Sequence, residues 1–461
     1  MDGSAATAPA VARAWRCMTC SHEHQGGEPP ANCPVCGASA DKFEGCDLYH
    51  LSVESYGNRS TIVVIGAGIS GISAAESARK SAPDARIIVV SREKELPYYR
   101  LNLTRYLAGE LAPDQLRLHP AGWYAEQRIE LMLGREVESI EVPGKILHLK
   151  GGGTVGFDKL ILSMGAHSFI PPIEGAAMQH VQGLRTCQDA IAISEHARPG
   201  KRCVVIGGGV LGLEAAAALA QQGTQTTIIE GFDWLLPRQL NRAAGELLAD
   251  HVQKLGIRLV LGGQVKKLIG NNQVEGVLLE SGEEIPADLV VFAAGVRCNS
   301  ALARQAQLEV NSGILVDNSL RTSHPDIFAV GDVAEHQGVL YGTWLPAQAQ
   351  GAIAGLNAVG GAGRFMGVPR SNNLKVLNVD LFSIGLILPE DGSYRCYESQ
   401  EEAGYAYFVF HNAQLVGAVL LGDTSIAAQV KKLIEEQRSC SELLAVAADG
   451  NDLTRRLMAG F

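Results

Sequence analysis

Short runs of β-branched residues alternate along the chain with longer segments rich in small apolar residues, and this pattern occurs twice. The first run, TIVVI from Thr61, ends in a cluster of glycines and is followed by a segment typical of a helix. A second run begins at Arg202 and leads into another glycine cluster and an alanine-rich segment. Strands that alternate with helical segments predict parallel sheets of the α/β class.

The similarity between the two halves continues beyond the glycines. The segment IELMLGREVESI (129–140) is echoed by IRLVLGGQVKKL (257–268). Each half then reaches an apolar run that ends in glycine, LILSMGA (160–166) and LVVFAAGV (289–296). The repeat therefore predicts two Rossmann-like dinucleotide-binding domains in one chain.

Both clusters have the spacing Gly-x-Gly-x-x-Gly. The first glycine permits a tight turn, the second lets a pyrophosphate approach, and the third allows close packing of helix on strand. The helix that follows attracts phosphate at its N-terminus. One such motif is a weak signal, but two copies in the same context predict two nucleotide sites. The glycines are Gly66, Gly68 and Gly71 in the first copy and Gly207, Gly209 and Gly212 in the second.

The C-terminal part changes character at about residue 366. Strand-like LKVLNVDLFSIGL (374–386) and YAYFVFHNAQLVGAVLLG (405–422) precede the helical segment SIAAQVKKLIEEQ (425–437). A tight turn is expected at His411-Asn412, between two apolar runs. We expect a small α+β domain with a structural role, because its sequence contains no catalytic constellation.

Composition and charge narrow the function. Hydrophobic residues make up 46% and charged residues 19% of the 461 residues, as in a globular protein with a large core. The net charge of −10 argues against a nucleic acid partner. The sequence contains neither an apolar run long enough to span a membrane nor a secretory signal, so a cytoplasmic location is expected.

Four of the ten cysteines are concentrated near the N-terminus, in two Cys-x-x-Cys pairs separated by twelve residues. The pairs are Cys17 with Cys20 and Cys33 with Cys36. Four thiolates at this spacing predict a tetrahedral site for iron or zinc, and the metal would hold so small a segment together. The spacing alone suits both metals.

The surroundings of these cysteines resemble the rubredoxin-like domain of rubrerythrins. The similar positions are Trp15-Arg16, Glu28-Pro29-Pro30, Cys33-Pro34 and Phe43-Glu44. Ser21 departs from the pattern, since rubredoxins usually have glycine there. The resemblance favours iron over zinc, and the departure is expected to alter the hydrogen bonds that tune the reduction potential.

Residues 61–365 resemble the two-dinucleotide flavoprotein family, which includes glutathione reductase, rubredoxin reductases and apoptosis-inducing factor. The resemblance implies that the first fold binds FAD and the second binds NAD(P)H. It also implies that the segment Ile327–Asp332 returns to the flavin, where Asp332 binds the ribityl chain. Further cofactor-binding positions expected from it are Arg100, Gly165, Gly295 and Gly331.

The strand ends indicate which nicotinamide is used. Glu230 ends the second strand of the second fold, where a carboxylate binds the ribose 2′-OH and repels a 2′-phosphate, so NADH is favoured over NADPH. In the first fold the sequence is Ser91-Arg92-Glu93, and relatives have glutamate at the position of Arg92. Either Glu93 substitutes for it or the ribose contact is lost.

Two residues are predicted to be catalytic. The segment Tyr98–Arg105 resembles a family segment with lysine at the position of Arg105, and in relatives that lysine pairs with a glutamate beside flavin N5. The resemblance therefore implies a charge pair between Arg105 and Glu214. The sequence contains no cysteine between Gly71 and Arg105, so thiol chemistry of the disulfide-reductase type is not expected.

The resemblance implies an FAD-dependent NADH:rubredoxin-type oxidoreductase. Hydride passes from NADH to FAD, and single electrons then pass to the fused iron centre and to an external acceptor protein of rubredoxin, rubrerythrin or oxygen- or peroxide-reductase type. Two alternatives stay open: an NADH oxidase with a zinc-bound docking ribbon, and a flavin-binding redox sensor. A homodimer through the C-terminal domain is compatible with the resemblance.

These predictions divide the chain into consecutive segments. They are a disordered tail (1–14), a rubredoxin-like domain (15–45), a linker (46–60), the FAD-binding domain in two parts (61–180 and 301–365), the NAD-binding domain between them (181–300), and a flavin-covering or dimerisation domain (366–461).

Overall fold

The computed structural model describes residues 13–17, 23–25, 28–33, 39–47, 60–368, 371–402 and 404–460. These residues fall into two compact units. Unit 1 contains the chain up to Lys94, Pro120–Met164 and Ser300–Phe365, and unit 2 contains Glu95–His119, Gly165–Asn299 and the chain from Met366 onward. The units group residues by contact rather than by ligand, so the domain boundaries given above stay a prediction.

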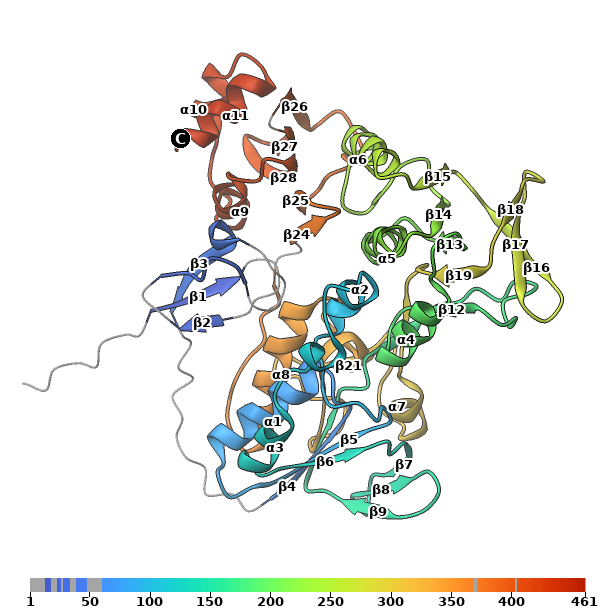
Figure 1. Ribbon diagram of the computed structural model, residues 1–461. Helices are drawn as coiled ribbons and strands as arrows, with labels where there is room; N and C mark the ends of the chain where they lie inside the picture. Colours follow the sequence, from blue (N-terminus) through green and yellow to red (C-terminus); the bar gives the residue numbers. More distant parts are fainter. Residues whose placement is uncertain are drawn as a thin grey trace, which may run out of the picture. The chain divides into compact units, whose positions relative to one another are not determined.

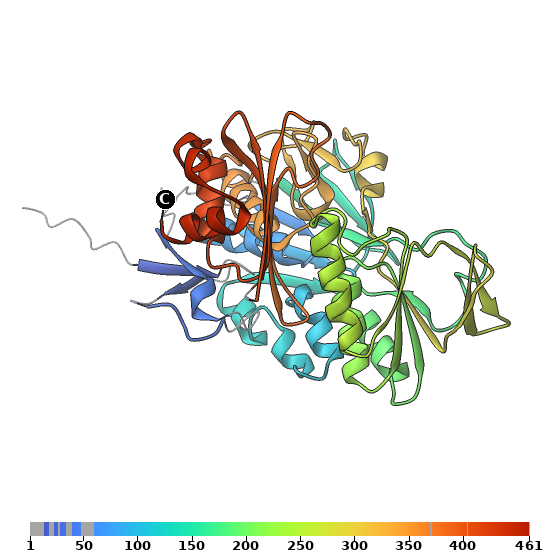
Figure 2. The same cartoon turned by 90° about the horizontal axis from the view of Figure 1, so that it is seen from above.

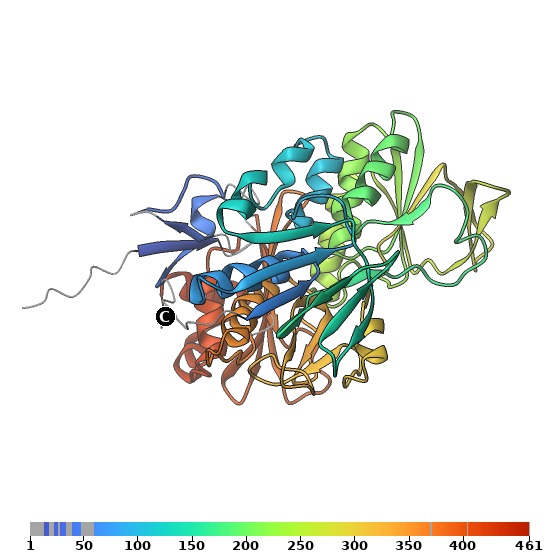
Figure 3. The same cartoon turned by 90° about the horizontal axis from the view of Figure 1, so that it is seen from below.

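Unit 1 is built around a parallel sheet in the order β22-β10-β4-β5-β6. The β-branched runs form its central strands because such side chains suit a sheet that is buried on both faces. Helices α1 and α8 lie side by side in this unit (Figure 1), and the blue strands β4 and β5 lie next to each other with the teal strand β6 beyond β5 (Figure 3). The elements are β4 (Thr61–Ile65), α1 (Ile69–Ser81), β5 (Arg86–Ser91), α3 (Ala121–Glu126), β6 (Ile129–Leu133), β7 (Val137–Glu141), β8 (Ile146–Leu149), β9 (Thr154–Gly156), β10 (Lys159–Leu162), α7 (Ala301–Gln305), β21 (Ile314–Val316), β22 (Ile327–Ala329), β23 (Ala334–His336) and α8 (Trp344–Ala358).

Unit 2 repeats this arrangement with the parallel sheet β12-β19-β13-β14-β15. Helix α5 packs on β13 and β14 as α1 packs on β4 and β5. The elements of this part are α2 (Leu103–Leu107), β11 (Ala166–Ser168), β12 (Val181–Gly183), α4 (Cys187–His196), β13 (Arg202–Ile206), α5 (Val210–Gln221), β14 (Gln225–Glu230), α6 (Arg242–Lys254), β15 (Arg258–Leu261), β16 (Val265–Gly270), β17 (Val274–Leu279), β18 (Glu284–Pro286), β19 (Leu289–Phe292) and β20 (Val296–Cys298).

The same kind of hydrogen bond, from a backbone N–H to an aspartate carboxylate, joins neighbouring parallel strands in both sheets. Asp158, just before β10, accepts a hydrogen bond from the backbone N–H of Thr61 at 2.7 Å. Asp288, just before β19, accepts one from the backbone N–H of Arg202 at 2.9 Å. The predicted internal repeat is thus confirmed down to single hydrogen bonds.

The rest of unit 2 is the predicted α+β part, an antiparallel sheet in the order β24-β25-β28-β27-β26. Helices α9 and α11 pack on its strands β28 and β26, and Figure 2 shows the red helices beside this sheet. A bulge interrupts the register near Val409, and Asn412 and Ala413 have positive φ at the predicted turn. The elements are β24 (Ser371–Val376), β25 (Val379–Gly385), β26 (Arg395–Glu401), β27 (Gly404–His411), β28 (Gln414–Gly422), α9 (Ala427–Glu435), α10 (Ser441–Val446) and α11 (Gly450–Met458).

The N-terminal segments form a small antiparallel sheet of their own. Strand β1 (Arg13–Cys17) pairs with β2 (Glu23–Gln25) on one side and with β3 (Phe43–Asp47) on the other. The register places Cys17 opposite Phe43. Of the helices in the described part of the chain, none combines the length and the apolar character that crossing a bilayer requires.

Acid is expected to weaken unit 1 through Asp326, which precedes β22. Lys145 donates to its carboxylate at 2.6 Å and Lys159 donates to the other oxygen, and these bonds lower the pKa of Asp326 to about 2. A carboxylate with a depressed folded-state pKa contributes stability that is present above pH 4 and lost as the pH falls through about 2. Asp326→Asn should lower the free energy of unfolding by about 1–2 kcal/mol at pH 7 and by less at pH 3.

Urea unfolding of the parent and Asp326→Asn at both pH values measures this effect. Asp250→Asn, an exposed aspartate of α6, is the matched control and should change little at either pH. An equal loss at both pH values for Asp326→Asn would show that the ion pairs do not carry the effect.

Candidate cofactor sites

The first glycine loop lies in unit 1 between β4 and α1, and two of its glycines are required by the protein itself. Gly66 has a φ of +109°, and a Cβ there would lie 2.3 Å from the carbonyl oxygen of Ser163. A Cβ on Gly71 would lie 2.1 Å from the oxygen of Gly66. The turn and the close packing of α1 therefore exclude any larger residue at these two positions.

The second loop, between β13 and α5 in unit 2, has the same construction. Gly207 has a φ of +115°, with the oxygen of Ala293 2.6 Å from a built Cβ. At Gly212 a Cβ would lie 1.9 Å from the oxygen of Gly207. The first and third glycines thus have the roles that the sequence predicted for them.

The middle glycines, Gly68 and Gly209, differ from the others. A Cβ at either position would meet no heavy atom within 4 Å, and their φ values of −74° and −75° suit any residue. Each is the N-cap of its helix, α1 or α5. Neither packing nor backbone conformation demands glycine here, so the open space in front of each helix N-terminus fits a pyrophosphate group that must come close.

Glu230 lies at the end of β14, beside the second loop, and both of its carboxylate oxygens are held by backbone amides. The N–H of Gly208 donates to Oε2 at 2.6 Å, and the N–H of Phe232 donates to Oε1 at 2.9 Å. The side chain is buried, so its orientation is fixed before any ligand arrives. Each oxygen retains a lone pair that can accept a ribose hydroxyl.

The first fold has a serine where the second has Glu230. The N–H of Arg135 donates to the oxygen of Ser91, as that of Gly263 donates to the oxygen of Glu230. The N–H of Glu93 donates to Ser91 Oγ at 3.2 Å, in the place of the Phe232–Glu230 bond. The similarity to relatives pointed to Arg92 or Glu93, so Ser91 was not predicted as a site residue. Arg92 is exposed and Glu93 is partly exposed, and their cofactor-binding roles stay predictions.

The Gly331-Asp332 turn lies against the first glycine loop within unit 1. Gly331 has a φ of +75°, and a Cβ there would lie 2.5 Å from Ser70 Oγ on α1. Its backbone N–H donates to Gln350 Oε1 on α8 at 2.8 Å. Gln350 is almost fully buried, and its Nε2 has no hydrogen-bond partner. An orphaned buried donor at this turn fits a polar cofactor group, and sequence reasoning did not identify Gln350.

Substitution of Gln350 tests this fit. Gln350→Leu removes the acceptor for the Gly331 N–H and the orphaned donor, and we expect FAD to bind about tenfold more weakly. Gln350→Glu keeps an acceptor and loses the donor, so a similar loss in this variant would assign the effect to Nε2. The measurement is the FAD dissociation constant of reconstituted protein, and unchanged affinity in both variants would contradict the assignment.

The two predicted catalytic residues lie in unit 2, on α2 and α5, but they do not pair with each other. Arg105 Nε lies 3.0 Å from Glu110 Oε2, and the Glu214 carboxylate instead accepts a hydrogen bond from Thr104 Oγ1 at 3.1 Å. Burial is the main cause that raises the pKa of Glu214 to about 7, and the Thr104 hydrogen bond opposes it. The expected Arg105–Glu214 ion pair is therefore wrong for this structure, while the catalytic roles of both residues stay predictions.

Three further expected positions, Arg100, Gly165 and Gly295, also lie in unit 2. Arg100 stacks on the ring of Tyr98 at 5.0 Å and donates to the carbonyl oxygen of Arg185. Gly165 and Gly295, before β11 and β20, have φ values of +61° and +102°. A Cβ on Gly295 would meet no heavy atom within 4 Å. Binding of a cofactor by these residues stays a prediction.

The predicted metal site is described only in part. Cys17, at the end of β1, and Cys33 are both buried, whereas Cys20 and Cys36 lie outside the described residues. In the part of the chain that the structure describes, no three potential ligands come together. The four-thiolate site therefore stays a prediction.

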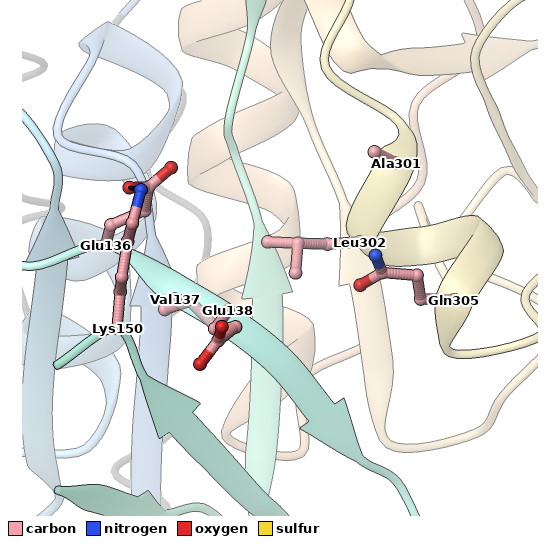
Figure 4. A pocket seen from close by; sticks show the side chains of 7 residues that line it. All are labelled: Glu136, Val137, Glu138, Lys150, Ala301, Leu302 and Gln305. Atoms are coloured by element: carbon pink, nitrogen blue, oxygen red, sulfur yellow. Dashed lines mark hydrogen bonds and ion pairs between the residues drawn. The ribbon is translucent and has the colours of Figure 1, made fainter. Parts of the chain in front are cut away.

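Unit 1 also has a surface pocket. Glu136, Val137, Glu138 and Lys150 line one side, and α7 lines the other (Figure 4). Lys150 Nζ lies 2.9 Å from Glu136 Oε2, so the charges of the pocket already neutralise each other in part. We assign it no role in the reaction.

Comparison with known families identifies the class of protein. The signature of the pyridine nucleotide-disulphide oxidoreductases matches residues 60–353. That of the rubredoxin NAD+ reductase C-terminal domain matches residues 371–438, and that of the rubredoxin-like domain of rubrerythrin matches residues 15–44. The chain belongs to the pyridine nucleotide-disulphide oxidoreductase family, which confirms the predicted resemblance, fold class and oxidoreductase class.

Individual relatives are similar over most of the chain. The NADH-rubredoxin oxidoreductase of Clostridium acetobutylicum is 31% identical over 392 residues, which are 85% of this chain and 99% of that protein. The nitrite reductase [NAD(P)H] of Bacillus subtilis is 32% identical over 387 residues, 83% of this chain and 48% of that protein. The chain spans about half the length, or less, of the nitrite and nitrate reductases that it matches.

Solved structures of oxidoreductases are similar to this chain over most of its length. The NADH:rubredoxin oxidoreductase from Clostridium acetobutylicum has a TM-score of 0.73 at 28% identity, covering 86% of this chain and 99% of that one. The putidaredoxin reductase–putidaredoxin complex has a TM-score of 0.75 at 25% identity, covering 87% of this chain and 99% of that one.

Proposed function

We propose that this chain is an FAD-dependent NADH oxidoreductase that delivers electrons to an iron centre held by its own N-terminal cysteines, and from there to an acceptor protein. One observation carries the proposal: two dinucleotide folds in one chain each keep an open glycine in front of a helix N-terminus. Similarity to NADH-rubredoxin oxidoreductase and to the rubredoxin-like domain supports the choice of electron acceptor.

Each unit would hold one nucleotide with its own residues. In unit 1, the loop at Gly68, the Gly331-Asp332 turn and Gln350 would hold FAD, and in unit 2 the loop at Gly209 and Glu230 would hold NADH. When bound, FAD supplies an acceptor for hydride and a donor of single electrons. Cys17, Cys20, Cys33 and Cys36 would bind iron, and the covalent tether raises the local concentration of that centre.

The cysteines outside the two N-terminal pairs support electron transfer that does not use a redox-active disulfide. In the part of the chain from residue 60 onward that the structure describes, no cysteines are joined in a disulfide. Cys203 lies in β13, where burial raises the pKa of its thiol to about 11 and makes it a poor nucleophile. Cys187 and Cys440 are buried as well.

Flavin content and anaerobic reduction test the proposal. The purified protein should contain FAD. NADH should bleach the flavin absorbance at least as fast as the enzyme turns over. Protein that cannot retain FAD would overturn the proposal. Flavin reduction too slow for turnover would instead favour a redox sensor, and fast oxygen consumption by iron-free protein would favour an NADH oxidase.

Coenzyme choice is expected to depend on Glu230. Glu230→Ala removes a charged acceptor for the ribose hydroxyls, so NADH should bind about 10–100-fold more weakly, while NADPH should bind more tightly because its 2′-phosphate is no longer repelled. The dissociation constants of both coenzymes measure this. Asp233→Ala, an exposed aspartate three residues further, is the control. Unchanged discrimination in Glu230→Ala would remove Glu230 from the coenzyme site.

A further inference from the structure

The buried contact between α2 and α5 contains a hydroxyl–carboxyl pair that the expected ion pair does not explain. Thr104 is buried on α2, and its Oγ1 lies 3.1 Å from Glu214 Oε2 on α5. Glu214 follows the last glycine of the NADH loop by two residues and is partly exposed. The carboxyl is thus attached to the helix whose N-terminus would bind the coenzyme.

We propose that Thr104 is a positioning residue for hydride transfer: its hydroxyl holds the Glu214 carboxyl in its ionised form beside the nicotinamide nucleotide. The inference rests on the proposed function for the identity of the coenzyme. In this proposal the partner of the Glu214 carboxyl is the neutral hydroxyl of Thr104, and not the positive charge of Arg105 that the sequence had led us to expect.

The chemical reason lies in the charge that develops on the coenzyme. NADH gives up a hydride, two electrons with one proton, and becomes NAD+, while the hydride passes to the bound flavin. The nicotinamide thereby gains a positive charge, which a carboxylate stabilises and a neutral carboxyl does not. A hydroxyl that donates to the ionised carboxylate favours that form, because a charge-assisted hydrogen bond is stronger than a neutral one.

The charged side chains described on the elements around α5 have other partners, so the Thr104 hydroxyl is the group that holds the Glu214 carboxylate. The elements packed against α5 are α2, β13, β14 and β24. On α2, Arg105 pairs with Glu110; on β13, Arg202 pairs with Asp288; on β14, Glu230 is held by backbone amides. The remaining titratable side chains that the structure describes on these elements are those of Tyr106 and Cys203.

The pKa of Glu214 agrees with this account. It is raised to about 7 by burial and lowered by the Thr104 hydrogen bond, with no contribution from a charged side chain among the described residues. Hydride transfer should therefore become faster as the pH rises through about 7 and Glu214 ionises. Removal of the hydroxyl should move this midpoint upward, since the ionised form loses its donor.

The experiment compares Thr104→Val, which has nearly the same shape without a donor, with Thr104→Ser, which keeps the hydroxyl. Infrared difference spectra of the holoprotein against Glu214→Gln follow the carbonyl stretch of the protonated Glu214 carboxyl as a function of pH. Rapid mixing with NADH gives the pH profile of flavin bleaching for the same variants.

We expect Thr104→Val to raise both midpoints by about one pH unit, so that flavin bleaching slows about tenfold at acid pH and recovers at alkaline pH. Thr104→Ser should restore the parental midpoints, and Glu214→Gln should abolish the pH dependence. Unmoved midpoints in Thr104→Val, or an equal shift in Thr104→Ser, would overturn the inference.

Failure of the proposed function would look different. A parent protein whose flavin NADH does not bleach would contradict that function, while the infrared midpoints would still report whether Thr104 controls Glu214. A parent that is reduced normally, with a pH profile that all three variants share, would contradict only the inference.

Discussion

Gly209→Leu is expected to weaken NADH binding at least about 100-fold, which corresponds to about 2.7 kcal/mol, while the protein stays folded and retains FAD. The physical reason is that Gly209 has an ordinary backbone conformation and open space around its Cβ. The Cβ of a leucine there would meet no heavy atom within 4 Å, and the rest of the side chain is expected to fill the approach to the N-terminus of α5. The measurement is the dissociation constant of NADH, followed by its fluorescence.

The internal repeat supplies two matched controls. Gly68→Leu makes the same change in unit 1. It should weaken the binding of FAD rather than the binding of NADH. Gly212→Ala places a Cβ 1.9 Å from a backbone oxygen, so it should lower the thermal unfolding temperature, which Gly209→Leu should hardly affect. Normal NADH affinity in Gly209→Leu would mean that this loop does not bind the coenzyme.

Cys17→Ser is expected to reduce the bound iron from about one ion per chain to almost none, because a tetrahedral site of four thiolates loses one ligand. The visible absorption of the iron–thiolate centre should disappear with it. FAD binding and flavin reduction by NADH should persist, since the glycine loops of both units have their own supporting contacts. Metal analysis and absorption spectra of purified protein measure both effects.

Cys396→Ser is the matched control for this change, since Cys396 is an exposed cysteine of β26 outside the two Cys-x-x-Cys pairs. It should leave the iron content unchanged. Zinc in place of iron in the parent, after expression with ample iron, would contradict the choice of metal, and full iron in Cys17→Ser would contradict the ligand set.

The repeat explains why so much of the fold was predictable from the sequence. Glycine spacing and β-branched runs are local signals, and each recurs with the same neighbours in both halves. The loops at Gly66 and Gly207 therefore have the predicted geometry, and Glu230 ends its strand as expected. The sequence also predicted the turn between β27 and β28.

What the sequence did not predict depends largely on contacts. Ser91 was not predicted as a site residue because similarity to relatives pointed to Arg92 or Glu93, and only the strand pairing shows that Ser91 occupies the place of Glu230. The Thr104–Glu214 bond required knowing which face of α2 meets α5. The turn within the strand-like segment 374–386 was not predicted; Leu377 and Asn378 take positive φ values of 54° and 66° there, between β24 and β25.

Gln350 shows a further limit of sequence reasoning. It lies in α8 among small apolar residues, with no motif around it, and only the structure reveals that its Oε1 accepts from Gly331 while its Nε2 is orphaned. Buried polar atoms without a partner are visible only once packing is known.

The central claim is that one chain contains a flavin that NADH reduces and a thiolate-bound iron that receives the electrons. Anaerobic rapid mixing of the protein with NADH, recorded at flavin and iron wavelengths, tests it most directly. We predict a flavin phase followed by an iron phase in the parent, and the flavin phase alone in Cys17→Ser. Iron that stays oxidised in the parent while its flavin is fully reduced would contradict the claim.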